Sequence, residues 1–469
     1  FSSSVLFEFD KFDKLIEYIS IERELSKERL ISKSLISLSL SISLILYISI
    51  IKYKLIFIFK QDKMSSNALY IQSGGMTSVI NNTAYTIIQT VKKYPKKINK
   101  LYAGIYGIVG VLEDNLIDTS TLTEQELEGI KNSPGGVFGT SRYKIKSLND
   151  DLPLYKKLVN ILKKYNIHYI FYNGGNDSAD TALKLSKISS TFNYKLCCIA
   201  VPKTIDNDIA CTDVSPGFGS SAKYIATSMY EASIDLKSMC KTSTKVFIME
   251  IMGRHTGWLT AASAVWKDKN SDPPHICLLP EILFNQKKFL KMVSKCVNKY
   301  GYCSIAVSEG LKNENNIFLS DKKIYDSFEH VQLGGVALIL SEMVQNELGY
   351  KCHYSIPDYL QRAGKHLCSK LDIEIANAVG KAAVEFAIQD KNNVMPCIKT
   401  IQNKPYKYKI EPISLNQIAN VERKLPNDFI DEENLTITTK CKEYITPFIS
   451  GEIYPKYDKN GKPFYISFT

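Results

Sequence analysis

Short apolar runs recur along the chain, and glycine or proline follows most of them within a few positions. The clearest runs lie at residues 68–72, 168–172, 196–201, 245–250 and 304–307. Apolar runs of this length that end at turn residues are typical of strands buried on both faces of a sheet. Helix-like segments follow the glycine turns, so the pattern predicts repeated parallel α/β units.

Two segments predict helices clearly. Residues 220–236 are entered through Gly217 and Gly219, and residues 372–389 carry apolar side chains at helical spacing. Because parallel strands open their carboxyl ends onto one edge of a sheet, ligands are expected in the loops that follow the strands. After Met395 the chain becomes polar and irregular, and residues 396–469 are predicted to form a tail that packs on the body, without an assigned function.

Residues 1–63 differ from the rest. They begin with Phe1 and contain a Ser/Leu/Ile-rich tract at residues 34–51. Three interpretations compete: translation of a frame upstream of the native start, a single membrane anchor, or a targeting segment. Alternating serines make the tract a poor membrane span, and no small-residue cleavage site follows it. We favour Met64 as the functional start, with residues 1–63 as an extension outside the native fold.

Composition narrows the class of protein. With 45% hydrophobic and 23% charged residues in 469 positions, the chain is typical of a globular protein with two large domains. Eleven cysteines without a CxxC pair favour reduced thiols and a cytoplasmic location over a disulfide framework or a zinc site.

The net charge of +11 lies mostly outside the extension, since residues 1–63 have ten Lys or Arg and eight Asp or Glu. The lysines are spread rather than clustered with aromatic residues. This distribution favours phosphate-bearing small molecules as partners and disfavours nucleic acid.

Two neighbouring segments carry the candidate chemistry, namely NGGNDS at residues 173–178 and VPKTIDND at residues 201–208. Phosphoryl transfer needs glycine backbone against phosphate oxygens, carboxylates for Mg2+, a cation for the developing charge and a base for the attacking hydroxyl. These segments supply nearly all of those groups. In an extended segment Asp206 and Asp208 would face the same side.

Further blocks give a specific resemblance. They are SGGM at 73–76, GGVFGTSR at 135–142, PGFGSS at 216–221, MGRHTGW at 252–258 and YLQR at 359–362. In this order the blocks resemble the 6-phosphofructokinase family on its pyrophosphate-dependent branch, from about residue 68 to about residue 387. The resemblance implies two Rossmann-like three-layer α/β domains with the active site in the cleft between them. Residues 64–215 and 363–395 would form the larger, donor-binding domain, and residues 216–362 the smaller, sugar-phosphate-binding domain.

The resemblance assigns a donor site to Gly75, Arg142, Gly175, Asn176 and Asp177. At the position of Asp177 the family usually has glycine in ATP-dependent members and aspartate in pyrophosphate-dependent ones, because a carboxylate there would repel the α-phosphate of ATP. Lys203 also matches the pyrophosphate branch, where a compact ammonium can hold the donor.

The resemblance makes Asp206 the general base for the C1 hydroxyl of fructose 6-phosphate, with Lys203 and Thr204 completing the catalytic set. Asn176 and Asp208 would bind Mg2+. The implied sugar-phosphate ligands are Thr204, Asp206, Asp208, Met252, Gly253, Arg254, Glu309, Tyr359, Arg362, Lys245 and His353.

Three positions depart from the usual family pattern. Asn176 stands where aspartate is common, so Asp208 would carry more of the metal site. Lys245 and His353 stand where the family places arginines that reach the 6-phosphate across a subunit interface. Histidine is charged only in mildly acidic solution, so sugar-phosphate affinity is expected to fall between pH 6.5 and pH 8 unless the local alignment is shifted.

The sequence thus predicts a Mg2+- and pyrophosphate-dependent 6-phosphofructokinase that makes fructose 1,6-bisphosphate and phosphate reversibly in glycolysis. The family implies a homodimer or homotetramer. Two alternatives stay open: an ATP-dependent enzyme of the same fold, and a non-catalytic regulatory subunit. No membrane partner is expected unless the extension is native.

Overall fold

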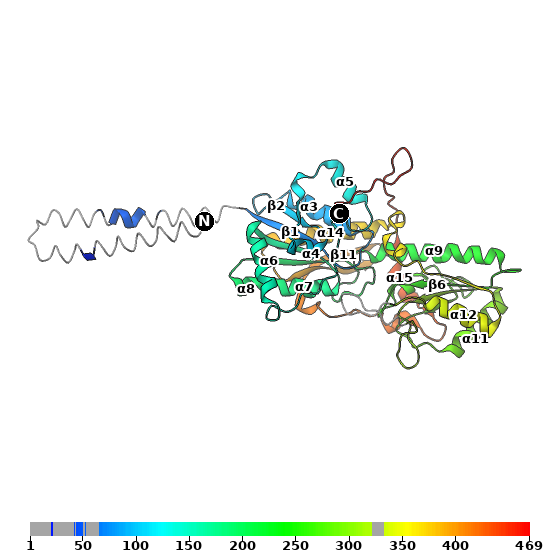
Figure 1. Cartoon of the computed structure of the whole chain (residues 1–469). Helices are drawn as coiled ribbons and strands as arrows, with labels where there is room; N and C mark the ends of the chain where they lie inside the picture. Colours follow the sequence, from blue (N-terminus) through cyan, green and yellow to red (C-terminus); the bar gives the residue numbers. More distant parts are fainter. Residues whose placement is uncertain (1–19, 22–41, 43, 50–51, 53–64, 321–332) are drawn as a thin grey trace, which may run out of the picture. The chain divides into compact units, whose positions relative to one another are not determined.

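The computed structural model describes residues 20–21, 42, 44–49, 52, 65–320 and 333–469, and the chain forms two compact units, Phe1–Ser65 and Ser66–Thr469 (Figure 1). The expectations for residues 1–63 fall almost wholly outside the described residues. Among the helices in the described ranges, none combines the length and the apolar character that a membrane crossing requires. The second unit contains both α/β sheets and the candidate site.

The larger sheet has seven strands in the order β11-β10-β5-β4-β1-β2-β3. Their bounds are β11 Tyr406–Ser414, β10 Val394–Asn403, β5 Cys197–Pro202, β4 Ile167–Gly174, β1 Ser66–Gln72, β2 Ile98–Gly104 and β3 Leu116–Asp118. The strands from β10 to β2 run parallel, and β11 and β3 are antiparallel to their neighbours.

Successive side chains of β1 pack into hydrophobic cores on opposite faces of this sheet. Ala68 and Tyr70 belong to one core cluster, together with residues of α3 (Ile80–Val91), α5 (Glu124–Asn132) and α14 (Lys370–Ile388). Leu69 and Ile71 belong to another cluster, with residues of α4 (Gly107–Leu112), α6 (Leu152–Lys164) and α7 (Asn176–Ser186), beside which α8 (Ile188–Phe192) follows. Period-two alternation therefore produces a three-layer arrangement.

The smaller sheet is entirely parallel, in the order β7-β8-β6-β9. Its strands are β7 Ile276–Leu278, β8 Cys303–Ser308, β6 Val246–Ile251 and β9 Cys352–Ser355. Val246 and Ile248 pack with α11 (Gln286–Tyr300) and α12 (Val336–Leu348), whereas Met249 and Ile251 share a cluster with α9 (Phe218–Met239) and α10 (Trp258–Ala262). The expected pair of three-layer α/β domains is therefore confirmed (Figure 1).

The expectation of an irregular segment after Met395 is wrong. β10 joins the larger sheet beside β5, with Val394 opposite Ile199, and β11 pairs along the length of β10. The short pair β12 (Ile430–Asp431) and β13 (Thr436–Ile437) and the helix α15 (Thr439–Ile445) follow. Exposed lysines at 407 and 409 alternate with half-buried side chains in the first half of β11, as in an edge strand, which gives the segment its polar appearance. The proposed domain limits stay a prediction, because Ser66–Thr469 forms one compact unit.

Candidate active site

A cavity of about 1450 Å³ lies at the carboxyl ends of strands from both sheets. Loops after β1, β4 and β5 contribute one side, and loops after β6 and β8 contribute the other. The cavity is lined by fourteen of the predicted site residues: Gly75, Arg142, Gly175, Asn176, Asp177, Lys203, Thr204, Asp206, Asp208, Met252, Arg254, Glu309, Tyr359 and Arg362. The strand ends thus bring together blocks that lie far apart in the sequence, as expected for open parallel sheets.

The loops after β1 and β4 form the predicted donor side. Gly175 is the N-cap of α7, and Asn176 and Asp177 occupy the first turn. A Cβ atom at position 75 would lie 2.9 Å from the Arg362 guanidinium. Glycine at this position therefore leaves room for the guanidinium beside the turn. The Gly75 carbonyl accepts a 2.5 Å hydrogen bond from the Lys203 ammonium. Backbone N–H groups at a helix start, next to cations, favour an anionic ligand.

Lys203 is only 4% exposed. Burial lowers the pKa of its ammonium to about 7, and the nearby Arg362 guanidinium acts in the same direction. Two buried or half-buried cations beside one glycine turn repel each other in the absence of an anion. A bound polyphosphate would relieve that repulsion.

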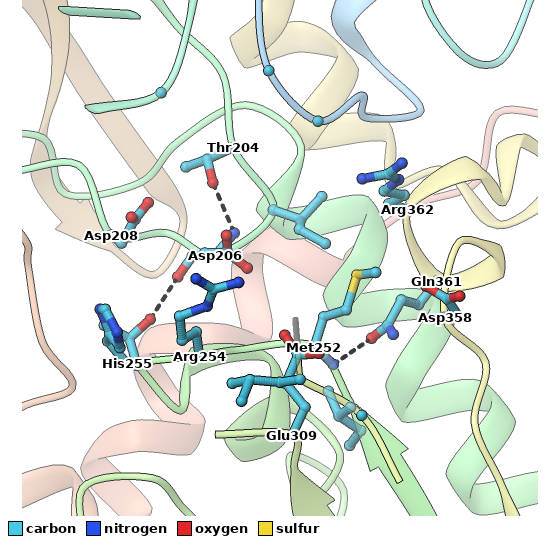
Figure 2. Close-up of a pocket in the computed structure, with 18 of the residues that line it drawn as sticks. Thr204, Asp206, Asp208, Met252, Arg254, His255, Glu309, Asp358, Gln361 and Arg362 are labelled. Carbon is cyan, nitrogen blue, oxygen red and sulfur yellow. Dashed lines mark hydrogen bonds between the residues drawn. The ribbon is translucent and has the colours of Figure 1, made fainter. Parts of the chain in front are cut away.

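The loop after β5 carries the two carboxylates. Two threonine hydroxyls hold the backbone of Asp206 (Figure 2). Its N–H donates to the Thr204 hydroxyl at 3.1 Å, and its carbonyl accepts from the Thr256 hydroxyl at 3.4 Å. Burial raises the pKa of Asp206, and the Glu309 carboxylate adds to this shift. Burial also raises the pKa of Asp208, with Asp206 as the second cause. A raised pKa suits a carboxylate that must accept a proton during a reaction.

Asn176 and Asp208 have the oxygens that a metal would use. The Oδ1 atoms of both side chains are buried and have no hydrogen-bond partner among the described residues. The remaining Nδ2 atom of Asn176 donates to Asp208 Oδ2 at 3.1 Å. Neighbouring carboxylate and amide oxygens with unused lone pairs fit a hard divalent cation such as Mg2+.

The predicted sugar side is built from the loops after β6 and β8. Glu309 Oε1 accepts from the Gly253 N–H at 3.2 Å, and Arg254 extends toward Asp206 (Figure 2). Burial raises the pKa of Glu309. Arg362, from α13 (Leu360–Ala363), stacks on the Tyr359 ring at 3.9 Å. Gly253 lies outside the cavity lining but orients Glu309 through this hydrogen bond.

Lys245 and His353 do not reach the cavity within one chain. Lys245 directly precedes β6, and its ammonium donates to the carbonyls of Cys240 and Lys241. His353 lies on the edge strand β9, opposite Phe247. Both positions lie toward the amino end of β6, whereas the cavity opens at the carboxyl end. Their predicted role therefore requires a second copy of the chain.

The structure adds lining residues that the sequence analysis did not predict. They include Glu250, Asp358, Gln361 and the segment containing Asn420, Val421, Glu422 and Lys424. The Glu250 carboxylate accepts hydrogen bonds from the N–H groups of Gly335 and Ala337 at the start of α12. The adjacent glycines at 334 and 335 were a usable signal. Residues 420–424 offer no local motif.

The profile of the family described as phosphofructokinase matches residues 67–387. The chain belongs to the phosphofructokinase family. A pyrophosphate–fructose 6-phosphate 1-phosphotransferase of Halomonas elongata is 47% identical over 397 residues, which are 85% of this chain and 94% of that protein.

Two solved pyrophosphate-dependent phosphofructokinases are similar to most of this chain. The enzyme of Marinobacter aquaeolei has 46% identity and a TM-score of 0.77, covering 85% of this chain and 95% of its own. The enzyme of Nitrosospira multiformis has 46% identity and a TM-score of 0.79, covering 86% and 96%. Similarity over nearly the full length of these relatives confirms the family and the fold that the motifs indicate.

Proposed function

We propose that this chain transfers a phosphoryl group from pyrophosphate to the C1 hydroxyl of fructose 6-phosphate, giving fructose 1,6-bisphosphate and phosphate. One observation carries the choice of donor: Asp177 and Lys203 both line the donor side of the cavity that contains Asp206. The carboxylate of Asp177 disfavours ATP, and the names of the similar proteins support pyrophosphate over the two alternatives. Reversible transfer of this kind belongs to glycolysis.

Asp206 is the proposed base. It accepts the proton of the C1 hydroxyl as the oxygen forms its bond to phosphorus, and the bond to the leaving phosphate breaks. Thr204 fixes the backbone of Asp206, so the carboxylate is oriented before substrate arrives. Lys203 and Arg142 would stabilise charge on the donor, and Arg362, which lies beside Gly75 and stacks on Tyr359, would bind the sugar phosphate.

Mg2+ is the proposed cofactor, held by the Oδ1 atoms of Asn176 and Asp208. When bound, it supplies positive charge to the pyrophosphate oxygens. With only one carboxylate in this pair, Asp208 provides the charge and Asn176 provides a neutral oxygen.

Residues 216–362 are proposed to bind the sugar phosphate, through Arg254, Glu309 and Tyr359. Residues 64–215 and 363–395 would bind the donor. All eleven cysteines lie in the described ranges and are free thiols, which supports a reducing compartment, the cytoplasm.

A homo-oligomer is proposed as the functional form, because Lys245 and His353 could contribute only to the site of a neighbouring copy. Exposed large apolar side chains support it: Tyr230 and Ile234 of α9 are 43% and 52% exposed, and Trp266, which contacts the Tyr230 ring, is 43% exposed. Sedimentation of the purified chain would test this. A monomer at micromolar concentration would contradict it.

The function is tested by assaying the purified full chain with fructose 6-phosphate, Mg2+ and either pyrophosphate or ATP. We expect fructose 1,6-bisphosphate with pyrophosphate only. Activity with ATP alone would reverse the choice of donor. A folded protein that is silent with both donors would support a non-catalytic subunit.

A further inference from the structure

Residues 420–424 contact the loop after β5 that carries Asp206 and Asp208, which we call the catalytic loop. The Arg423 N–H donates to the Asp208 carbonyl at 2.7 Å, and Glu422 forms a bridge with Ile209. On its other side, the Arg423 carbonyl accepts from the Trp258 indole N–H at 3.2 Å. One residue therefore joins the loop after β5 to the block at residues 252–258, which carries Arg254.

Arg423 points away from the cavity that its neighbours line. Asn420, Glu422 and Lys424 line the cavity, as alternate residues of an extended segment do, and Val421 lines it as well. Arg423 lies between Glu422 and Lys424 in sequence and stacks on the buried Trp258 ring at 4.3 Å. Its guanidinium donates to the Asp213 carbonyl at 2.8 Å, so the other end of the loop is held as well.

Tyr444, from α15, completes the arrangement. Its hydroxyl accepts from Asn207 Nδ2 at 2.8 Å and from the Arg423 guanidinium at 3.0 Å, and it donates to the Asp213 carbonyl. Asn207 is fully buried between the two carboxylates in sequence and has φ +55°. Its Oδ1 atom accepts from the Ser215 N–H at 3.0 Å. A left-handed residue persists where surrounding contacts over-determine it.

We propose that Tyr444 and Arg423 are positioning residues for the phosphoryl transfer, Tyr444 acting through Asn207 and Arg423 through the Asp208 carbonyl and the Tyr444 hydroxyl, so that Asp206 and Asp208 are fixed; this rests on the proposed function. Without the Tyr444 hydroxyl, the Asn207 amide becomes a buried donor without an acceptor. The cost of this unpaired donor shifts the catalytic loop toward conformations in which the amide has another acceptor. Displacements of about 1 Å at reacting groups reduce turnover roughly 100-fold. The C-terminal segment is thereby part of the catalytic apparatus.

The test compares Tyr444→Phe with Tyr406→Phe. Both substitutions remove one phenol oxygen from a half-buried ring that packs on Phe448, at 5.2 Å and 5.0 Å. The Tyr406 hydroxyl forms a 3.2 Å hydrogen bond with the Thr400 hydroxyl, and no hydrogen bond joins it to Asn207 within the described residues. We expect Tyr444→Phe to lower kcat roughly 10- to 100-fold with KM values within about twofold, and Tyr406→Phe to leave both near wild type. Thermal unfolding of both variants controls for stability.

Asn207→Gly supplies the second arm, since glycine adopts a positive φ without strain. If the hydroxyl acts through Asn207, the double variant is little worse than either single variant. Equal kcat for the two phenylalanine variants, or effects of Tyr444→Phe and Asn207→Gly that multiply, would overturn the proposal.

A wild type that is inactive with pyrophosphate would overturn the proposed function instead. Calorimetric titration with Mg2+ alone then still tests the positioning role. Weaker Mg2+ binding in Tyr444→Phe than in Tyr406→Phe supports it, and equal binding refutes it.

Discussion

The amide of Asn176 donates to the Oδ2 atom of Asp208 at 3.1 Å, which ties the first turn of α7 to the loop after β5. Asn176→Asp replaces this donor with a second carboxylate. In the absence of metal the two carboxylates repel each other, and a divalent cation relieves the repulsion. We expect a lower half-saturating Mg2+ concentration in both activity and calorimetry. Asn420→Asp, in the cavity wall but outside the pair, is the matched control; unchanged Mg2+ affinity in Asn176→Asp would contradict the site.

Asp206→Asn is expected to lower kcat by roughly 10²- to 10⁴-fold, because the amide cannot accept the proton of the attacking hydroxyl. The side chain keeps its size, so KM for both substrates is expected to change little. Asp235→Asn, on the exposed side of α9, serves as the control and leaves kcat unchanged. Near-normal turnover of the Asp206 variant would place the base elsewhere.

Asp177→Gly is expected to make ATP a usable donor. A carboxylate about 4 Å from a phosphate charge costs on the order of 4 kcal/mol at an effective dielectric constant of 20, so kcat/KM for ATP should rise at least roughly tenfold. Asp177→Asn separates charge from bulk, because it removes only the charge. If neither variant uses ATP, Asp177 does not select the donor.

Pyrophosphate affinity is expected to depend on Lys203 protonation. Burial lowers the pKa of this ammonium to about 7, so the cation is present below pH 7 and is lost as pH rises through that value. Between pH 6 and pH 8 the charged fraction of the free enzyme falls about tenfold. Pyrophosphate itself titrates in this range, so the comparison is with Lys203→Arg, which stays charged. The ratio of wild-type to variant affinity, measured by calorimetry, should fall with pH; a constant ratio would contradict the prediction.

Gly217 and Gly135 both have positive φ, but only Gly217 is crowded. A side chain at Gly217 would lie 2.4 Å from the Thr77 methyl group and 3.0 Å from the Thr204 carbonyl, whereas nothing lies within 4 Å at Gly135. Gly135→Ala is expected to lower the free energy of unfolding by about 1 kcal/mol, and Gly217→Ala by more, roughly 3 kcal/mol or above. Urea denaturation measures both. Equal losses would show that backbone strain alone decides the cost.

The buried parts of the fold were predictable because burial leaves continuous apolar runs. The run at residues 196–201 corresponds to β5 (Cys197–Pro202), and the run at residues 245–250 corresponds to β6 (Val246–Ile251). The glycine turns after β1 and β4, together with the segment after β5, were sufficient to predict that Gly75, Gly175 and Asp206 lie at one edge. By contrast, β11 is an edge strand with lysines in alternation, and such a strand resembles a polar loop in sequence.

The wall formed by residues 420–424 could not have been predicted from local sequence. Arg423 works through backbone groups and through partners more than 160 positions away, such as Trp258. Hydrogen bonds to carbonyl groups carry no residue signature. Lys245 and His353 show a second limit of prediction from one sequence. The 6-phosphate that they are expected to bind would lie in the site of a neighbouring copy of the chain.

The pairing of Val394 with Ile199 has a consequence for biosynthesis. These two residues are 195 positions apart, so β5 leaves the ribosome long before the strand that covers it. At elongation rates of about 5–20 residues per second, β5 remains an open edge of the nascent sheet for roughly 10–40 s. An open edge can pair with another chain during that interval. Translation of the final segment therefore determines when the nascent protein stops being prone to aggregation.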